Sequence, residues 1–569
     1  MRDAALRRWP PGVAIARSYQ RAWLRSDITA GVVLTALLIP AGIGYAQAAG
    51  LPAETGLYAT IVPLLAYAVV GPSRILVLGP DSSLAPIIAT SVLPLAAGDP
   101  QRAVALAGLL ALMMGAILVL GGLIRIGFVT DLLSKPIRVG YLNGIALVVL
   151  VGQLPKLLGF SISSTSLLGD VREIARGISD GRVDTTAFGV GVAALVIILV
   201  PRLLRSRVPG VLIAITAAIA VTAAFGWKDD FPVVGALPQG LPAPALEGLH
   251  WNDVASLAWP ALGIALIAFA DTGVLSRTFA ARQGRSVDGS HEMAAIGAAN
   301  IAGGLLGGFP VSASSSRTPV AEQAGARTQL AGVVGATLIV GFMLIAPGVT
   351  GYLPSSALAA VVIVAAAALV DVRGFLWLAR VDRVEAALSL AAFLGVTLVG
   401  VLEGIAIAVG LSFVAFVNHS WRPYRAELGR VGGLRGYHDL SRHTTGARVP
   451  GVVIVRFDAP LFFANGGIFD DFVRSRVNAA GETVHTVILA AEPITDIDTT
   501  AVDELVELDD FLRSRGITLL IAEMKGPVKD ILRRYNLGDR FGPERFMPTV
   551  GAAVDSITGE FRSDLEPPP

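Results

Sequence analysis

Two serine clusters are the residues of this chain whose types and spacing best suit chemistry, and that chemistry is anion binding. One lies in GPSRILVLGPDSSLAP (71–86) and the other in GGFPVSASSSRTPVAEQ (307–323). In each, glycine precedes a short extended stretch, and serines then open an unusually short apolar segment. A helix that begins at membrane depth directs unpaired N–H groups and the positive end of its dipole at the space before it. The serines that add hydroxyl donors there are Ser82, Ser83, Ser314, Ser315 and Ser316.

Four ionisable residues fall at or near the same depth, where such side chains are costly and usually functional: Asp81, Asp271, Arg317 and Glu322. Arg317 either adds a positive charge to the anion site or pairs with Asp81 or Asp271 as a structural ion pair. Asp81 suits a helix N-cap, yet a fixed carboxylate beside the site would repel an anion. Because burial favours the neutral form of a carboxyl group, we hypothesise that Asp81, Asp271 or both carry a proton inward with the anion. Na⁺ bound near Asp271 is the rival coupling ion, and Glu322 is expected to be structural.

An interrupted apolar run, LLIPAGIGYA (37–46), places one aromatic residue near these clusters. Pro40 removes a backbone donor and kinks a helix. The kink allows Tyr45 to present its ring and hydroxyl to the anion site. A kink that serves only helix packing explains this stretch equally well.

Several other classes of site have no support in the sequence. The chain has no cysteine, so disulfides and thiol chemistry are excluded, and its six histidines show no metal-ligand spacing. No nucleophile–base pair or metal-ligand group stands out. We therefore expect no enzymatic activity, no metal and no cofactor, and the net charge of +1 gives no reason to expect nucleic acid as a partner.

Long apolar segments must position the clusters, and they predict an α-helical polytopic membrane protein. Of the 569 residues, 53% are hydrophobic, and the mean hydropathy is +0.66. A spanning helix needs about 20 apolar residues. Residues 1–27 are predicted to be a cytoplasmic N-terminal segment, and residues 28–419 a transmembrane domain. The fourteen predicted spans are 28–48, 55–71, 82–97, 102–122, 130–151, 186–202, 209–226, 256–276, 291–308, 314–324, 328–347, 354–371, 384–400 and 402–418.

Loop charges orient these spans. If the N-terminus is inside, the short inside loops hold fourteen Lys and Arg and the outside loops hold six. Cytoplasmic loops are the ones enriched in these residues. The pattern predicts a multi-pass protein of the inner (plasma) membrane with both termini in the cytoplasm. The first apolar run is long and lacks a cleavage-like site, so we interpret it as a span and not as a removable signal peptide.

The fourteen spans also divide into two inverted repeats of seven, a common design of transporters. Pro40 precedes Ser82 by 42 residues, and Asp271 precedes Ser314 by 43 residues. Gly and Ser are common at any packed helix interface in a membrane. Two such clusters at matching repeat positions, each heading a short span, favour an anion site over packing alone.

The last part of the chain is predicted to be a small α/β domain. Residues 452–458, 486–492 and 517–523 have the composition of buried strands, and apolar periodic helices follow near 466–479, 499–515 and 525–536. We expect a linker at 420–449, the domain at 450–558 and a disordered tail at 559–569.

The chain resembles the sulfate permease family, SulP or solute carrier 26, over nearly its whole length. The resemblance extends to a C-terminal STAS domain (sulfate transporter and anti-sigma-factor antagonist), which the turn DIDTTAVDEL (496–505) also matches. The matching stretches are AGVVLTALLIPAGIGYAQAAGLPAETGLYATIVP (30–63), GPSRILVLGPDSS (71–83), GGFPVSASSSRT (307–318), QAGARTQLAG (323–332) and PGVVIVRFDAPLFFANG (450–466).

This resemblance implies a core domain of spans 1–4 and 8–11 that moves against a gate domain of spans 5–7 and 12–14. It places the anion between the starts of spans 3 and 10 and implies a homodimer. Thr500 matches a position that is phosphorylated in related bacterial regulators, although hydroxyls there also cap helices. By position, the implied anion-binding residues are Tyr45, Ser82, Ser83, Ser314, Ser315, Ser316 and Arg317, with Asp271 as the coupling residue.

Two departures from the family pattern bear on substrate and coupling. Ala41 replaces a glutamine of span 1, and Leu275 stands where sodium-coupled members tend to have a hydroxyl. We expect secondary active transport of an inorganic anion, sulfate first, by proton symport with an elevator-like movement. The alternatives are sodium-coupled bicarbonate transport, proton-coupled dicarboxylate transport, exchange, and a non-transporting anion sensor that acts through the STAS domain.

Overall fold

The computed structural model describes residues 10–126, 134–162, 166–204, 210–238, 240–241, 243–282, 284–314 and 317–559. The chain forms two compact units, Met1–Ser412 and Phe413–Pro569. Each unit is described by itself below.

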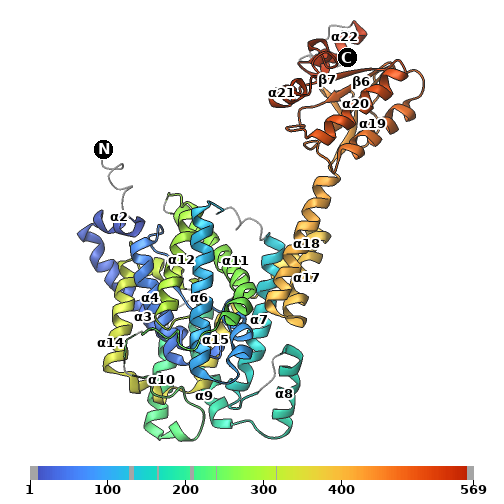
Figure 1. Ribbon diagram of the computed structural model, residues 1–569. Coiled ribbons are helices and arrows are strands. Elements are labelled where there is room, and N and C mark those ends of the chain that lie inside the picture. The colour runs from blue at the N-terminus through green and yellow to red at the C-terminus, as the bar shows by residue number, and fades with distance from the viewer. Residues whose placement is uncertain are drawn as a thin grey trace. The chain divides into compact units, whose positions relative to one another are not determined.

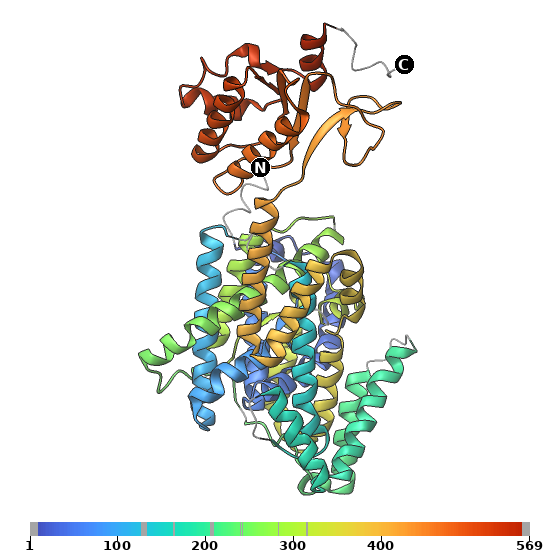
Figure 2. The same ribbon diagram turned by 90° about the vertical axis from the view of Figure 1, so that its right-hand side faces the viewer.

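The first unit is a helical bundle (Figures 1 and 2). Each of the fourteen predicted spans corresponds to a helix of the chain. Among the described residues, six helical stretches are long and apolar enough to cross a membrane on their own. The third and tenth spans are short, as predicted. The helices are α3 (Leu24–Ala48), α4 (Ala53–Val70), α5 (Ala85–Ala96), α6 (Pro100–Leu123), α7 (Lys135–Leu157), α9 (Thr185–Leu203), α10 (Gly210–Phe225), α11 (Trp251–Arg282), α12 (Gly289–Leu305), α13 (Arg317–Gln323), α14 (Leu330–Ile345), α15 (Ser355–Ala367), α17 (Arg383–Leu398) and α18 (Val401–Trp421).

In the described part of the first unit, three further α-helices lie outside the predicted spans, and the chain also has several 3₁₀ turns. Short amphipathic helices of this kind give no long apolar run, so a search for spans does not find them. The α-helices are α2 (Pro11–Arg17), α8 (Leu167–Ser179) and α16 (Val372–Val381). The 3₁₀ turns among the residues that the structure describes are Arg21–Trp23, Trp227–Asp229, Pro347–Tyr352 and Pro543–Arg545.

The packing of the helices follows the inverted repeat. Exchanging α3–α7, α9 and α10 for α11–α15, α17 and α18 converts several pairs of neighbouring helices into other neighbouring pairs. Thus α6 packs on α12 as α14 packs on α4, α3 on α14 as α11 on α6, and α7 on α17 as α15 on α9. A two-stranded antiparallel ribbon joins the two repeats, with β1 (Leu78–Gly79) beside β2 (Ser312–Ala313).

Small residues allow the helices to approach closely. Lipid tails are as apolar as side chains, so helices in a membrane associate through close packing and not through the hydrophobic effect. On α6 and α12, a Cβ added at Gly115 would lie 2.6 Å from the Gly297 carbonyl oxygen, and one added at Gly304 would lie 2.6 Å from that of Gly108. This interface therefore requires glycine, and it holds the first repeat against the second.

The second unit contains a six-stranded sheet in the order β4-β3-β5-β6-β7-β8, with β5 to β8 parallel. Alternate strand residues pack against α19, α20 and α21 on one face and against α22 on the other. The three predicted strands and helices are confirmed. The elements are β3 (Arg425–Arg430), β4 (Tyr437–Asp439), β5 (Val452–Phe457), β6 (Thr486–Ala490), β7 (Thr518–Ala522), β8 (Phe546–Met547), α19 (Gly466–Ala480), α20 (Thr499–Ser514), α21 (Gly526–Arg534) and α22 (Val550–Thr558).

The predicted linker at 420–449 is wrong over part of its length, because β3 and β4 belong to the sheet. Along β3, the apolar residues Ala426 and Leu428 alternate with charged residues, and both are buried against the sheet. The Arg- and Gly-rich composition of this segment concealed the two-residue alternation. Of the predicted tail, only Gly559 lies within the described residues.

Candidate anion-binding site

The ribbon of β1 and β2 brings the two serine clusters together. Leu78 pairs with Ala313 and Gly79 with Ser312. Beside this pair, the Ser314 N–H donates to the Val77 carbonyl at 3.0 Å. The Val77 N–H donates to the Thr318 hydroxyl at 3.2 Å. Segments more than 230 residues apart in the sequence are thus fixed side by side, each followed by a short helix.

Ser82 and Ser83 lie buried in the turn before α5. The Ser83 hydroxyl donates to Asp81 Oδ2 at 3.1 Å. The expectation that Asp81 is an N-cap is wrong, because α5 begins at Ala85, its N-cap is Leu84, and no side chain caps it. The extra turn before the helix moves Asp81 away from the capping position. Its side chain instead lies within the electrostatic reach of Arg317.

Arg317 is the first residue of α13 and is only 3% exposed. Its N–H donates to the Ser314 hydroxyl at 3.2 Å, and its Nη2 donates to the Pro80 carbonyl of the other cluster. Its Nε and Nη1 find no hydrogen-bond partner in the described part of the chain. The alternative of a structural ion pair within 4 Å of Asp81 or Asp271 is not observed among these residues. Ser315 and Ser316 lie outside the described residues.

Unpaired donors on a buried guanidinium carry a large desolvation cost unless an acceptor reaches them. Arg317 therefore has the properties of an anion-binding side chain. Gly79 makes room for it, since a Cβ there would lie 3.2 Å from Arg317 Nη1 and the residue has φ +155°.

Tyr45 and Asp271 approach the same point from α3 and α11. Tyr45 is 5% exposed and lies within the electrostatic reach of Arg317. Asp271 is near enough to Asp81 for the two charges to interact, and the Ser83 side chain lies between them. The structure thus brings together the site residues that it describes and that the sequence singled out. Glu322 stands apart, bound to Arg282 at 3.1 Å and 31% exposed, as expected of a structural residue.

Three supporting residues were missed by sequence reasoning. The Asn300 amide donates to the carbonyls of Ile296 and Val311, each at 3.0 Å, and accepts from the Val311 N–H at 2.8 Å. The Thr272 hydroxyl accepts from the Ala313 N–H at 3.1 Å, so α11 and α12 both hold the strand β2 in place. An asparagine within an apolar helix was an available signal for the first of these.

Tyr141 is the third of these residues. It is fully buried on α7 and donates to Asp271 Oδ1 at 2.9 Å. The two residues are 130 positions apart, and no local pattern in the sequence links them.

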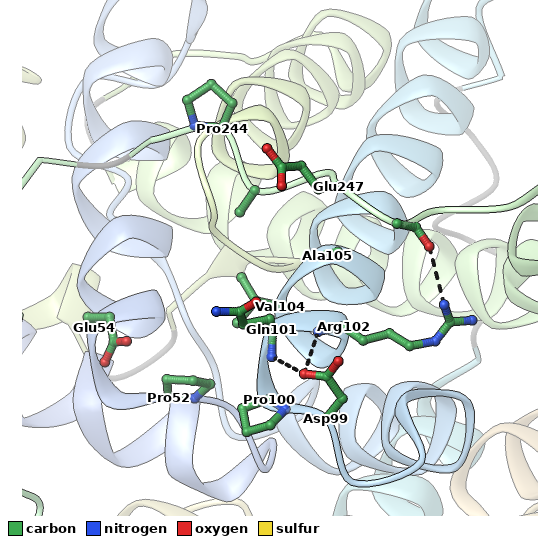
Figure 3. Close-up of a pocket in the computed structure, with 12 residues that line it drawn as sticks. Pro52, Glu54, Asp99, Pro100, Gln101, Arg102, Val104, Ala105, Pro244 and Glu247 are labelled. Carbon is green, nitrogen blue, oxygen red and sulfur yellow. Dashed lines mark hydrogen bonds between the residues drawn. The ribbon is translucent and has the colours of Figure 1, made fainter.

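A wider pocket of about 710 Å³ lies away from the serine clusters (Figure 3). Its lining includes the acidic residues Glu54, Asp99 and Glu247. The arginine in this lining, Arg102, already donates to the Gly248 carbonyl at 3.2 Å and forms an ion pair with Asp253 at 2.9 Å. This excess of negative charge is unfavourable for an anion, so the ribbon is the better candidate for the anion site than this pocket is.

No group of three metal-ligating side chains occurs within the residues that the structure describes. In the second unit, Thr500 is exposed near the start of α20. The cap of that helix is Asp498, which accepts from the Ala501 N–H at 2.9 Å. The Thr500 hydroxyl is therefore not the N-cap of α20. Phosphorylation of Thr500 stays a prediction.

Comparison with known proteins agrees with this architecture. Residues 24–392 match the family model "Sulfate permease family", and residues 446–553 match that of the STAS domain. A Mycobacterium tuberculosis protein described as a probable sulfate transporter is 39% identical over 96% of this chain and 98% of its own length. Sulfate transporter 1.3 of Arabidopsis thaliana is 27% identical over 98% of this chain and 88% of its own.

Solved structures show the same fold at low identity. Murine Solute Carrier 26 family member A9, an anion transporter solved in the inward-facing state, superposes with a TM-score of 0.89 at 21% identity, covering 98% of this chain and 95% of that one. The transmembrane domain of the cyanobacterial bicarbonate transporter BicA gives 0.59 at 21% identity, covering 70% and 98%. Because the permease model matches well over half of its residues, this chain belongs to the sulfate permease family.

Proposed function

We propose that this protein transports an inorganic anion, sulfate, across the inner membrane by secondary active transport. The observation that carries the proposal is the buried guanidinium of Arg317, whose Nε and Nη1 are without partners among the described residues and which lies between the two serine clusters. Membership of the family supports transport, and the relatives named as sulfate transporters support sulfate as the anion.

Uptake into proteoliposomes tests this proposal. Radiolabelled sulfate, bicarbonate and succinate are compared under an imposed proton gradient and an imposed sodium gradient. We expect sulfate uptake that requires an inward proton gradient. Sulfate that fails to enter under either gradient would refute the sulfate assignment, and no flux of any anion would favour a regulatory protein without transport.

We propose proton symport, with Asp271 as the coupling residue and Asp81 beside it. A carboxyl group that is neutral when the anion is bound removes the repulsion that two carboxylates would otherwise exert on the substrate. Asp271 is faced by Tyr141 of α7, Ser83, Asp81 and the charge of Arg138. Leu275, one turn along α11, offers no oxygen ligand to Na⁺.

Proton symport predicts that wild-type uptake falls as the external pH rises, because the inward proton gradient decreases. The Asp271→Asn and Asp81→Asn variants cannot exchange a proton at these positions. We expect each to flatten the pH profile of uptake, measured from pH 5.5 to 8 in proteoliposomes. If both variants keep the wild-type rate and profile, coupling does not run through these residues.

An elevator-like movement of a core (α3–α6, α11–α14) against a gate (α7, α9, α10, α15, α17, α18) is also proposed. Two polar contacts between described residues cross from one group of helices to the other. Tyr141 of α7 donates to Asp271 of α11, and Lys156 Nζ of α7 donates to the Gln47 carbonyl of α3 at 3.0 Å. If the groups slide past each other, these contacts must break in each cycle.

The Tyr141→Phe variant tests this movement. We expect a change of about threefold to tenfold in the maximal uptake rate with little change in the affinity for the anion, because one hydrogen bond to a charged group contributes about 1.5 kcal/mol. Tyr67→Phe is the matched control, since the Tyr67 hydroxyl binds Glu292 within the core alone. A Tyr141→Phe rate equal to that of Tyr67→Phe and the wild type would argue against the movement.

We also propose that both termini lie in the cytoplasm and that the protein is a homodimer. The basic inside loops support cytoplasmic termini, and the resemblance to the family supports a homodimer.

A further inference from the structure

An apolar groove of about 420 Å³ lies on the gate helices, away from the ribbon and from the wider pocket of Figure 3. Three elements form it, and α7 and α17 run side by side (Figure 1). Val370, which lies between α15 and α16, completes the lining. The other lining residues are Gly140, Asn143, Leu147 and Leu150 of α7, Val372 and Phe375 of α16, and Ser389, Leu390 and Phe393 of α17.

The polar groups of the groove offer little to a polar ligand. The Asn143 side chain is fully engaged, since its Nδ2 donates to the Val139 carbonyl at 2.7 Å and its Oδ1 accepts from the Asp371 N–H at 2.8 Å. The Ser389 hydroxyl has no hydrogen-bond partner among the described residues, but the side chain is 0% exposed, so a ligand in the groove does not reach it. The open rim is apolar too, with Leu147 36% and Leu390 44% exposed. An aliphatic chain is the ligand that such a surface favours.

The groove has a defined direction. A Cβ at Gly140 would meet the Ser389 backbone, and one at Gly144 would meet the Val396 side chain, so α7 and α17 run parallel along it. Both helices begin at the same end of the groove, and α16 lies at that end as well. The first residues of α7 and α17 are Lys135 and Arg383.

That end carries a cluster of cations without matching ion pairs. The cluster is Lys135, Arg373, Arg380 and Arg383, and no ion pair of these four is found among the residues that the structure describes. The nearby carboxylates are used as helix caps. Asp371 accepts from the Gly374 N–H at 2.7 Å, and Asp382 accepts from the Val384 N–H at 2.7 Å. The cations are therefore available to an anionic group.

The same end has the features of a membrane interface. Lys135 Nζ lies 4.0 Å from the centre of the Trp377 ring, and Trp377 is 49% exposed. Tryptophan and lysine are enriched where headgroups meet the hydrocarbon region. Exposed apolar residues of α16, Val372 and Leu376, fit a helix that lies in the plane of that interface.

We propose that this groove is a binding site for an acidic glycerophospholipid. One acyl chain lies along α7 and α17, and the phosphate headgroup lies at the cation cluster at the cytoplasmic end. Basic pockets between helices on that side of a membrane are suited to anionic headgroups. The lining includes Gly140, the residue before Tyr141, so the bound lipid also helps to position the helix that contacts Asp271. This last consequence rests on the proposed transport function, whereas the binding itself does not.

Native mass spectrometry of the purified full chain tests the site. The protein is mixed with equal amounts of phosphatidylglycerol and phosphatidylcholine of identical acyl chains, and the retained lipids are counted. We expect at least a fivefold preference for phosphatidylglycerol. The Arg380→Gln/Arg383→Gln variant should lose this preference, and Leu390→Trp, which fills the groove from an exposed position, should lower the retention of both lipids.

Two control variants match these changes elsewhere on the chain. Arg21→Gln/Arg25→Gln removes the same charge from another exposed basic segment, and Leu338→Trp adds the same ring at a residue of α14 that is 40% exposed. Both should bind lipid as the wild type does. Equal retention of the two lipids by the wild type would overturn the proposal, as would test variants that match their controls. A change of Leu390→Trp from dimer to monomer would show an interface between copies and would also overturn it.

Discussion

Replacing Arg317 by methionine is expected to lower anion uptake at least about a hundredfold. The guanidinium is buried, and its Nε and Nη1 have no partner in the described part of the chain. Two hydrogen bonds from a charged donor contribute about 1.5–3 kcal/mol each, and each 1.4 kcal/mol is about a factor of ten in affinity. Most of the loss should appear as a weaker apparent affinity for sulfate, measured by uptake in proteoliposomes over a range of sulfate concentrations.

Arg317→Lys separates charge from geometry. It keeps the positive charge and loses the planar fork, so we expect uptake between those of the wild type and Arg317→Met. Arg282→Met is the matched control, because it removes an arginine from the same part of the bundle that binds Glu322 instead of facing the ribbon. An Arg317→Met variant that folds and takes up sulfate with the affinity of Arg282→Met would exclude Arg317 from the site.

The second large effect concerns stability. Gly115→Val is expected to destabilise the membrane domain by about 3 kcal/mol or more, because its Cβ would lie 2.6 Å from the Gly297 carbonyl oxygen on α12. Neither backbone can yield without separating α6 from α12, which joins the two repeats. The expected result is a large fall in the yield of monodisperse protein and in the melting temperature, measured by size-exclusion chromatography after heating.

Gly341→Val on α14 is the control for this substitution. A Cβ at Gly341 would have nothing within 4 Å, so the same added side chain should leave stability nearly unchanged. If the two variants melt at the same temperature, helix propensity and not close packing sets the cost at Gly115.

Much of the architecture could be predicted from the local sequence pattern and from composition. Apolar runs with the length of a span located the fourteen helices, and the strand–helix alternation located the core of the STAS domain, because both signals are carried by adjacent residues. The repeat also follows from sequence, since matching the two serine clusters requires only their spacing. The strands β3 and β4 were missed because Ala426 and Leu428 alternate with charged residues over too few positions.

The residues of the candidate site were singled out from the sequence alone, because ionisable side chains such as Asp81, Asp271 and Arg317 are costly at membrane depth. Their partners do not. The pairing of Gly79 with Ser312, the Tyr141–Asp271 contact and the orientation of Arg317 toward Pro80 all join residues more than 100 positions apart. Such contacts depend on how whole helices pack. Only the tertiary structure therefore decided that Nε and Nη1 of Arg317 have no hydrogen-bond partner among the described residues, and that Asp81 lies near Arg317 instead of capping α5.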